Sequence, residues 1–255
     1  MSPLATLHLS AGRGEGVIVC SPSCGIAPNS GSGGETYERE LLLGLHSWGI
    51  FPHVLLARGK PYPPELAPLI EPVWIRKGLR WAVMPFVMPP FIARCWREHK
   101  PALLRAHSVR FLGPACLLAR RRYGIDVPVV VHAHHLEPGF LTRVLERPVL
   151  RAADLVIADS RFAAHQVRAL TGKGGNVKTI YCGAGEQYRP ARGEPFDGGI
   201  VGRYGLAGAR VTCLAVGPLI ARKDPLRMVR LFSRLARRAR GGALLVWLGA
   251  GPLRD

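Results

Sequence analysis

The chain has 255 residues, of which 48% are hydrophobic, 20% charged and 7% aromatic. This length and apolar content exclude a disordered, collagen-like or coiled-coil protein and allow one large domain or two smaller ones. The 35 lysines and arginines exceed the 17 acidic residues and leave a net charge of +18. Such a surplus favours a polyanionic partner, which could be nucleic acid, a phosphate-rich ligand or anionic lipid.

No targeting segment is apparent, because residues 1–16 lack the apolar stretch of a signal peptide. The longest apolar segment, residues 81–93, is 13 residues long and contains three prolines, whereas a membrane span needs about 20 apolar residues. The six cysteines lack the paired spacing of a zinc site and mostly lie in apolar runs. We therefore predict a cytoplasmic protein with buried thiols and no disulfide framework.

Short apolar runs alternate with longer amphipathic stretches through the first part of the chain. Strands are predicted at residues 17–20, 53–56, 103–106, 127–131, 155–158 and 177–181. Helices are predicted at residues 35–48, 113–122 and 160–170, the first with an apolar face of Tyr37, Leu41, Leu45 and Trp48. Strands that are apolar throughout are covered on both faces, so we predict a doubly wound parallel α/β domain over residues 1–183.

Residues 184–208 contain seven glycines and two prolines and are predicted to be a linker. Strand, helix and strand patterns resume at residues 211–216, 225–240 and 244–248. One such unit leaves sheet edges and one sheet face uncovered. We therefore expect residues 209–255 to be the beginning of a second Rossmann-like domain.

The first motif is a glycine-rich loop, Gly31 to Glu35, which precedes the first predicted helix. Glycines allow a ligand to approach the backbone, and a helix N-terminus presents unpaired N–H groups to an anion. Thr36 stands where a dinucleotide fingerprint has its last glycine, so NAD binding is not predicted. The alternative interpretation is a flexible loop that only caps the helix.

The second motif places His132, His134 and His135 at the carboxyl end of the predicted strand 127–131. Ligands of open α/β sheets bind at that end of the strands. We predict that a histidine contacts substrate, while packed or solvated histidines remain the alternative. No metal site is predicted, because Glu137 is the one acidic or cysteine partner nearby.

The third motif is the loop from Gly217 to Lys223, followed by Asp224 as a helix N-cap and Pro225 at the first helical position. Arg222 and Lys223 then stand where the helix dipole also favours negative charge. This arrangement suits a diphosphate leaving group. An exposed basic turn is the alternative.

In this order and spacing, the motifs resemble the family-4 glycosyltransferases of the GT-B fold, which have two Rossmann-like domains. The resemblance runs from about Val17 to the end of the chain. It is carried by residues 33–35, 101–108, 128–135, 152–160, 180–184, 217–223 and 248–252.

The resemblance implies a hexosyltransferase-like enzyme that uses a nucleotide-diphosphate sugar, retains anomeric configuration and needs no metal ion or other cofactor. It implies that the residue at His134 contacts the transferred sugar and that Lys223 binds the diphosphate. Pro218 replaces the arginine of the family, so Arg222 is expected to substitute for it. Substrate contacts are implied for Gly33, Gly34, Glu35, His107, Ser108, His132, His135 and Gly217.

The E-x7-E motif of the family, which holds the donor, has no counterpart, because no glutamate occurs after Glu194. We therefore expect the chain to be truncated in the donor domain and to have little or no transferase activity alone. Residues 76–122 contain eleven lysines and arginines and one acid, interleaved with aromatic residues. This suits a glycan or lipid-linked acceptor and an anionic membrane surface as partners, although a partly buried helix with a solvated charged side is the alternative.

No DNA- or RNA-binding signature accompanies the positive charge, so specific nucleic-acid binding is not expected. The rival hypothesis is a non-catalytic basic domain that binds a nucleotide or a polyanion.

Overall fold

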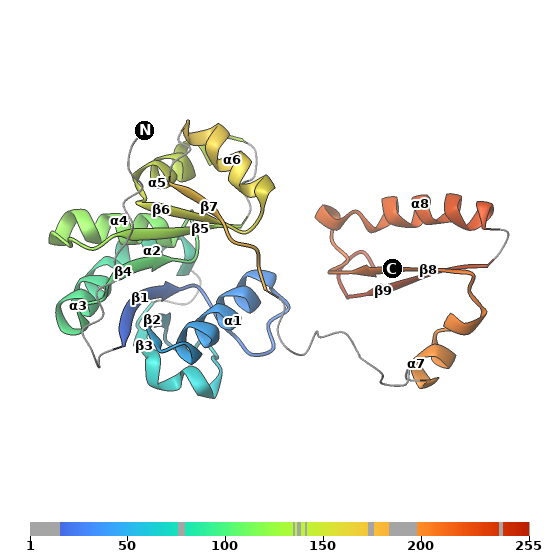
Figure 1. The fold of residues 1–255 in the computed structure, drawn as a ribbon, viewed down its shortest axis with the longest axis horizontal. Coiled ribbons are helices and arrows are strands. Elements are labelled where there is room, and N and C mark those ends of the chain that lie inside the picture. The colour runs from blue at the N-terminus through green and yellow to red at the C-terminus, as the bar shows by residue number, and fades with distance from the viewer. Residues whose placement is uncertain are drawn as a thin grey trace. The chain divides into compact units, whose positions relative to one another are not determined.

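The computed structural model describes residues 16–75, 80–134, 136, 139–140, 142–172, 176–183, 198–239 and 242–254. The chain divides into two compact units, Met1–Tyr188 and Arg189–Asp255 (Figure 1). The described part of the first unit holds the seven-stranded sheet, and that of the second holds a pair of strands.

Within the described residues, the sheet of the first unit has seven strands, all parallel, in the order β3-β2-β1-β4-β5-β6-β7. They are β1 (Val17–Ser23), β2 (Ile50–Ala57), β3 (Ile70–Val73), β4 (Leu103–Ala106), β5 (Val129–Ala133), β6 (Leu155–Ala158) and β7 (Val177–Thr179). The order reverses between β1 and β4, so the connections after these strands leave toward opposite faces. In open α/β sheets such a switch point forms a crevice at the carboxyl ends of the strands.

Helices cover both faces of this sheet (Figure 1). The strand β2 shows why, since Val54 and Leu56 pack in a small core with Leu42, whereas Leu55 and Ala57 join the main core. Successive residues of a strand point to opposite faces, so an apolar run needs cover on both. The predicted doubly wound α/β fold is confirmed. The helices of the first unit are α1 (Gly33–Ser47), α2 (Arg80–Val87), α3 (Pro89–His99), α4 (Leu112–Tyr123), α5 (Arg147–Ala152) and α6 (Arg161–Thr171), with a 3-10 helix at Pro64–Leu69 and a π-helix at Thr142–Glu146.

Two local predictions were wrong. Strand β3 was missed, because Glu71 and Pro72 interrupt its apolar pattern and proline is tolerated at the edge of a sheet. The buried residues of α1 are Glu38 and Leu42 rather than the predicted apolar face, and Trp48 is 83% exposed. A buried carboxylate occupies the centre of the inner face of this helix, and apolar periodicity cannot reveal that.

The apolar segment 81–93 covers all of α2 but its first residue and continues into the start of α3. Among the described residues, none of the helices combines the length and hydropathy that a membrane span requires. All six cysteines are described and are free, and four of them are buried. Burial raises the pKa of the Cys24 thiol to about 12.

The described part of the second unit has two parallel strands, β8 (Val211–Val216) and β9 (Ala243–Leu248), joined through α8 (Pro225–Arg238). Its other elements are α7 (Gly198–Arg203) and 3-10 turns at Leu206–Gly208 and Ala221–Lys223. The predicted linker 184–208 is therefore helical over most of residues 198–208, and residues 184–197 lie outside the described part. Glycines at this spacing did not prevent a short helix.

Candidate functional site

A cavity of about 500 Å³ lies in the first unit at the switch point of the sheet. Its walls come from the loop after β1, the start of α1, residues 107–111 after β4, the end of β5, and Glu146. All these segments except Glu146 follow the carboxyl end of a strand, where an open α/β sheet binds its ligands.

Strand register brings three histidines to this cavity. Ala106 pairs with Val131, so His107 comes to lie beside His132 at the adjacent strand. His134 lies two residues beyond His132, and its ring centroid is 5.0 Å from that of His107. Residues two apart along a strand share a face. The three rings therefore gather on one side of the sheet end.

Tyr37 of α1 packs against all three imidazoles. Its ring is stacked on His107 at 6.1 Å and meets His134 edge-on at 4.5 Å. Its hydroxyl lies 3.0 Å from Nδ1 of His132. Burial raises the pKa of Tyr37 to about 12, so the phenol stays protonated at neutral pH. The tyrosine thus ties α1 to the histidine cluster.

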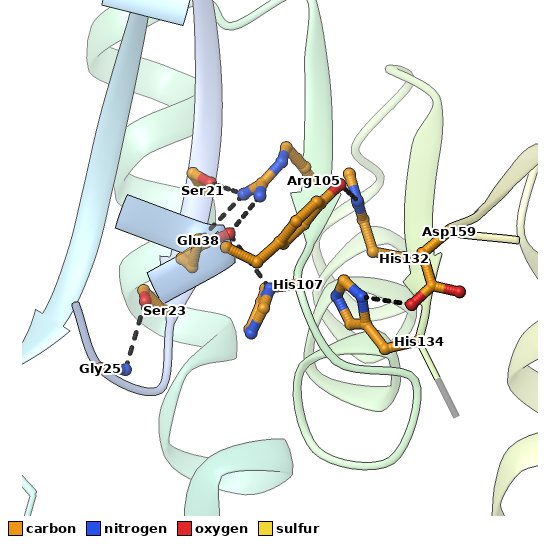
Figure 2. A network of polar contacts seen from close by, with 10 residues as sticks. Ser21, Ser23, Gly25, Glu38, Arg105, His107, His132, His134 and Asp159 are labelled. Carbon is orange, nitrogen blue, oxygen red and sulfur yellow. Dashed lines mark hydrogen bonds and ion pairs between the residues drawn. The ribbon is translucent and has the colours of Figure 1, made fainter. Parts of the chain in front are cut away.

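Beneath the rings lies a buried ionic network (Figure 2). Arg105 of β4 forms an ion pair with both carboxylate oxygens of Glu38 and donates to Oγ of Ser21 at 2.6 Å. Nδ1 of His107 lies 3.1 Å from Oε2 of Glu38. Burial opposes ionisation of Glu38, but Arg105 and His107 outweigh it and lower the pKa of this carboxyl. A buried ion pair with further hydrogen bonds holds its members in one geometry.

His134 is oriented by Asp159, which follows β6. Ala133 pairs with Ala158, and Nδ1 of His134 lies 3.5 Å from Oδ2 of Asp159 (Figure 2). A carboxylate only accepts, so this contact favours the tautomer with the proton on Nδ1 and the lone pair on Nε2. That Nε2 is buried and has no partner among the described residues. Burial and the neighbouring His107 lower the pKa of His134, although Asp159 opposes them, so the ring is neutral at pH 7.

The glycine loop leaves the start of α1 open. Apart from its chain neighbours and the backbone of its own helix, no atom of the described chain lies within 4 Å of where a Cβ on Gly33 would stand, and its φ is not positive. The N-cap, Ser32, makes no side-chain capping bond within that part of the chain. Neither packing nor backbone geometry requires glycine here. The open helix start instead leaves N–H groups available to a ligand.

In the second unit, two loops that follow β8 and β9 lie against each other. A Cβ on Gly249 would stand 2.0 Å from the carbonyl oxygen of Gly217, and one on Gly251 would stand 2.4 Å from that of Leu219. Leu219 and Ala250 share a backbone hydrogen bond of 3.0 Å. The glycines at 249 and 251 therefore permit a contact that any side chain would block.

Lys223 and Arg222 are exposed in the turn that precedes α8. Cε of Lys223 lies 3.7 Å from the position of a Cβ on Gly217. Asp224 is the predicted N-cap, and its Oδ1 accepts from the backbone N–H of Arg227 at 3.2 Å. Two cations thus lie beside the start of α8, and the first turn of this helix contains no acidic residue.

The predicted site residues fall into two groups. The cavity collects Gly34, Glu35, His107, Ser108, His132 and His134. Gly33 is the first residue of α1 and does not line it, and His135 lies outside the described residues. Gly217, Arg222 and Lys223 belong to the second unit.

Six residues of the site were missed: Tyr37, Glu38, Arg105, Arg110, Glu146 and Asp159. Arg105 carried a signal, because a charge inside an apolar strand must have a buried partner. Within the described part of the chain, no cluster of three His, Cys, Asp or Glu side chains could hold a metal ion.

Comparison with known proteins gives the family and the fold. The model of Glycosyltransferase Family 4 matches residues 31–187, from the glycine loop past the last strand of the sheet. The chain belongs to glycosyltransferase family 4. The match covers the three histidines of the cavity and, of the ionic network, Glu38, Arg105 and His107. A comparison with curated proteins gave no match.

Solved glycosyltransferases share the fold. HepE from Anabaena in complex with UDP-glucose aligns with 91% of this chain and 69% of its own, at 14% identity and a TM-score of 0.57. The lipopolysaccharide outer core galactosyltransferase WaaB aligns with 91% of this chain and 68% of its own, at 15% identity and a TM-score of 0.57. Starch synthase IV from Arabidopsis thaliana, bound to ADP and acarbose, aligns with 93% of this chain and 69% of its own, at 12% identity and a TM-score of 0.59. At these identities the likeness shows the fold, which is of the GT-B type that the motifs predicted.

Proposed function

We propose that this family-4 glycosyltransferase transfers a hexose, with retention of configuration, from a nucleotide-diphosphate sugar to a glycan or lipid-linked acceptor. In the reaction, the bond between the anomeric carbon and the diphosphate oxygen breaks. The acceptor hydroxyl forms the new bond to that carbon, and its proton leaves with the diphosphate. No metal ion or other cofactor takes part in this proposal.

The observation that carries the proposal is the state of His134. Its ring is held by Asp159, is neutral at pH 7, and has a buried Nε2 without a partner among the described residues. A hydroxyl group of a sugar is a fitting donor to such a nitrogen. Leaving the nitrogen unsatisfied is unfavourable, so a bound sugar would supply the hydrogen bond that no described residue provides.

On the donor side, Arg222, Lys223 and the start of α8 supply the positive charge that a departing diphosphate requires. Complexes of the related HepE contain UDP, UDP-glucose, or UDP and glucose, which supports a nucleotide sugar as the donor. The base and the sugar of this donor are left to the assay.

A single-turnover assay tests the proposal. The full chain is mixed in excess with radiolabelled nucleotide sugars and candidate acceptors, and the anomeric configuration of the product is determined by NMR. His134→Ala should reduce transfer by about 100-fold or more, whereas His165→Ala, at an exposed position on α6, should not. Absence of both transfer and nucleotide binding for every donor would reject the proposal, and an inverted product would reject retention.

Binding of UDP tests the donor side separately. Lys223→Ala should weaken binding by about tenfold or more, since a charge-assisted bond to phosphate is lost. Arg230→Ala, an exposed arginine further along α8, is the matched control. Equal losses in the two variants would indicate a diffuse attraction to polyanions. Salt-sensitive binding of a random oligonucleotide, unaffected by nucleotide sugars, would favour the non-catalytic alternative.

We also propose that turnover by this chain alone is weak, because the chain has no glutamate after Glu194 to hold the donor as the family's E-x7-E motif does. Transfer should therefore be seen with excess protein rather than in multiple-turnover conditions. Robust multiple turnover would overturn this part of the proposal and leave the reaction class intact.

We further propose a cytoplasmic protein that binds the anionic face of a membrane. Trp74 and Phe86 are 68% and 74% exposed. Arg94 and Arg97 on α3 and Lys100 at its C-cap are also exposed. Aromatic and basic side chains suit a headgroup region. The protein should float with vesicles that contain anionic lipid and sediment with purely zwitterionic ones. Failure to float with anionic vesicles would remove the membrane from the proposal.

A further inference from the structure

We propose that Glu146, held by Arg110, binds a hydroxyl group of an uncharged sugar in the cavity and thereby forms the acceptor subsite. The inference rests on the proposed function and deepens it by naming the class of acceptor group. Neither residue was among those that the sequence motifs pointed to.

The carboxylate of Glu146 is buried, and one of its two oxygens has a partner among the described residues. The residue is 4% exposed and lines the cavity. Arg110 approaches one oxygen, Oε1, with Nε at 2.7 Å and with its second terminal nitrogen at 2.6 Å. The other oxygen, Oε2, is buried and has no hydrogen-bond partner within the described residues. A buried carboxylate oxygen without a donor is costly, so a ligand that donates to it gains affinity.

The backbone supports this placement. Glu146 is the last residue of a π-helix, Thr142–Glu146, that leads into α5. Pro148 lies in the first turn of α5 and has no N–H to give to a preceding carbonyl, so a regular α-helix cannot run through this point. Single π turns within helices occur frequently at functional sites. Here the turn delivers a carboxylate to a cavity that is otherwise built from strand ends.

The charges around the cavity decide between classes of ligand. Of the lysines and arginines in the described part of the chain, Arg110 is the one that lines the cavity, and it is paired with Glu146. The other lining carboxylate, Glu35, lies 3.7 Å from Lys60. Beside Glu146, a phosphate or carboxylate of the ligand would therefore meet a carboxylate and a cation that is already engaged. An uncharged hydroxyl meets an acceptor instead.

His134 extends this argument across the cavity. Its Nε2 is an acceptor, as is Oε2 of Glu146, and both lack partners in the described region. Sugars carry several hydroxyl groups, each able to donate one hydrogen bond. A cavity of about 500 Å³ is within the range that holds a small ligand. Two unpaired acceptors in one cavity thus match a hexose better than they match a phosphorylated headgroup.

The test measures the binding of methyl hexosides and of the corresponding hexose phosphates to the full chain by ligand-observed NMR titration. We expect the hexosides to bind more tightly. Glu146→Gln keeps the shape and removes the charge, and should weaken hexoside binding by about tenfold or more. Arg110→Gln should weaken hexoside binding as well, because Oε1 of Glu146 loses the ion pair that holds the carboxylate in place. Glu65→Gln, on an exposed 3-10 turn, is the matched control. Circular dichroism of each variant checks that it is folded.

Several results would overturn the inference. These are unchanged binding by folded Glu146→Gln, tighter binding of the hexose phosphates, or no binding of any hexoside by the wild-type chain. UDP binding and single-turnover transfer separate this failure from that of the function. If the wild-type chain binds UDP and transfers sugar, but hexoside binding is the same in Glu146→Gln as in the wild type, the subsite is wrong and the transferase stands. If the wild-type chain neither binds UDP nor transfers sugar, the proposed function fails together with the subsite.

Discussion

Nδ1 of His134 lies 3.5 Å from Oδ2 of Asp159, and the two residues follow strand ends that are paired in register. The histidine therefore owes its orientation to a residue 25 positions later in the chain. Asp159 raises the pKa of His134 while burial lowers it more. The carboxylate consequently sets the tautomer without charging the ring.

Asp159→Asn tests this relationship. The amide removes the negative charge, so the pKa of His134 should fall further below its ordinary value, and the tautomer with the proton on Nδ1 should lose its preference. Histidine NMR signals followed through a pH titration measure the pKa, and the nitrogen shifts report the tautomer. Asp126→Asn, remote from the site in the loop before β5, should leave both unchanged. An unaltered His134 titration in Asp159→Asn would contradict the assignment.

Glu38→Gln should destabilise the fold strongly. The carboxylate is fully buried and is the ionic partner of Arg105, which is itself 4% exposed. Removing it leaves a buried guanidinium without a counter-charge, which costs about 3–5 kcal/mol of the free energy of unfolding. Urea denaturation measures the loss. Glu40→Gln on the same helix, where the side chain is 40% exposed, should cost less than about 1 kcal/mol. Equal effects of the two would contradict a structural role for the buried pair.

Acidification should destabilise the first unit in two steps. Burial, aided by Arg105, holds the pKa of His132 well below 6.5, so below pH 6.5 the unfolded chain takes up a proton that the folded chain refuses. The free energy of unfolding then falls as pH falls, by up to about 1.4 kcal/mol per pH unit for one group. His134 contributes in the same direction.

The second step belongs to Glu38, whose folded pKa is lowered. Its contribution is present above the unfolded pKa and is lost as pH falls through the folded one. Thermal denaturation between pH 8 and pH 3 should show both steps. His132→Gln should flatten the upper step and leave the lower one, and an unchanged upper step would refute the role of His132.

Gly249→Ala should disrupt the loop pair of the second unit. The new Cβ would stand 2.0 Å from the carbonyl oxygen of Gly217, and the backbone at Gly249 has φ +153. Trp247 donates its indole N–H to the same oxygen at 2.8 Å, so the indole proton resonance of this tryptophan should shift or lose its protection from exchange. A Cβ on Gly202 in α7 would have no atom of the described chain within 4 Å apart from its chain neighbours and its own helix backbone, so Gly202→Ala should be tolerated. A wild-type indole signal in Gly249→Ala would contradict the contact.

The sequence was informative where one signal dominated. Strands β4, β6 and β8 were predicted with their observed bounds, because short and mostly apolar runs flanked by polar residues, glycine or proline leave few choices. Asp224 was recognised as an N-cap from its place before a proline. Strand β3 was lost because a glutamate and a proline hide an edge strand, and the face of α1 was misjudged because Glu38 is buried as part of an ion pair.

By itself, the sequence predicted the α/β class from its apolar runs, and the order of its motifs resembled family 4 and pointed to the histidines and glycines of the site. Local patterns report burial and backbone preference, and these depend on neighbours a few residues away. What Tyr37, Arg105, Asp159 and Glu146 do was decided by the tertiary structure. The register of the parallel strands brings Asp159 to His134, which lies much earlier in the chain. The π-helix brings Glu146 to a cavity whose other walls come from earlier segments of the chain. Hydrogen bonds and charge compensation act over a few ångströms in space, so the partners of a buried polar group become visible when the sheet is assembled.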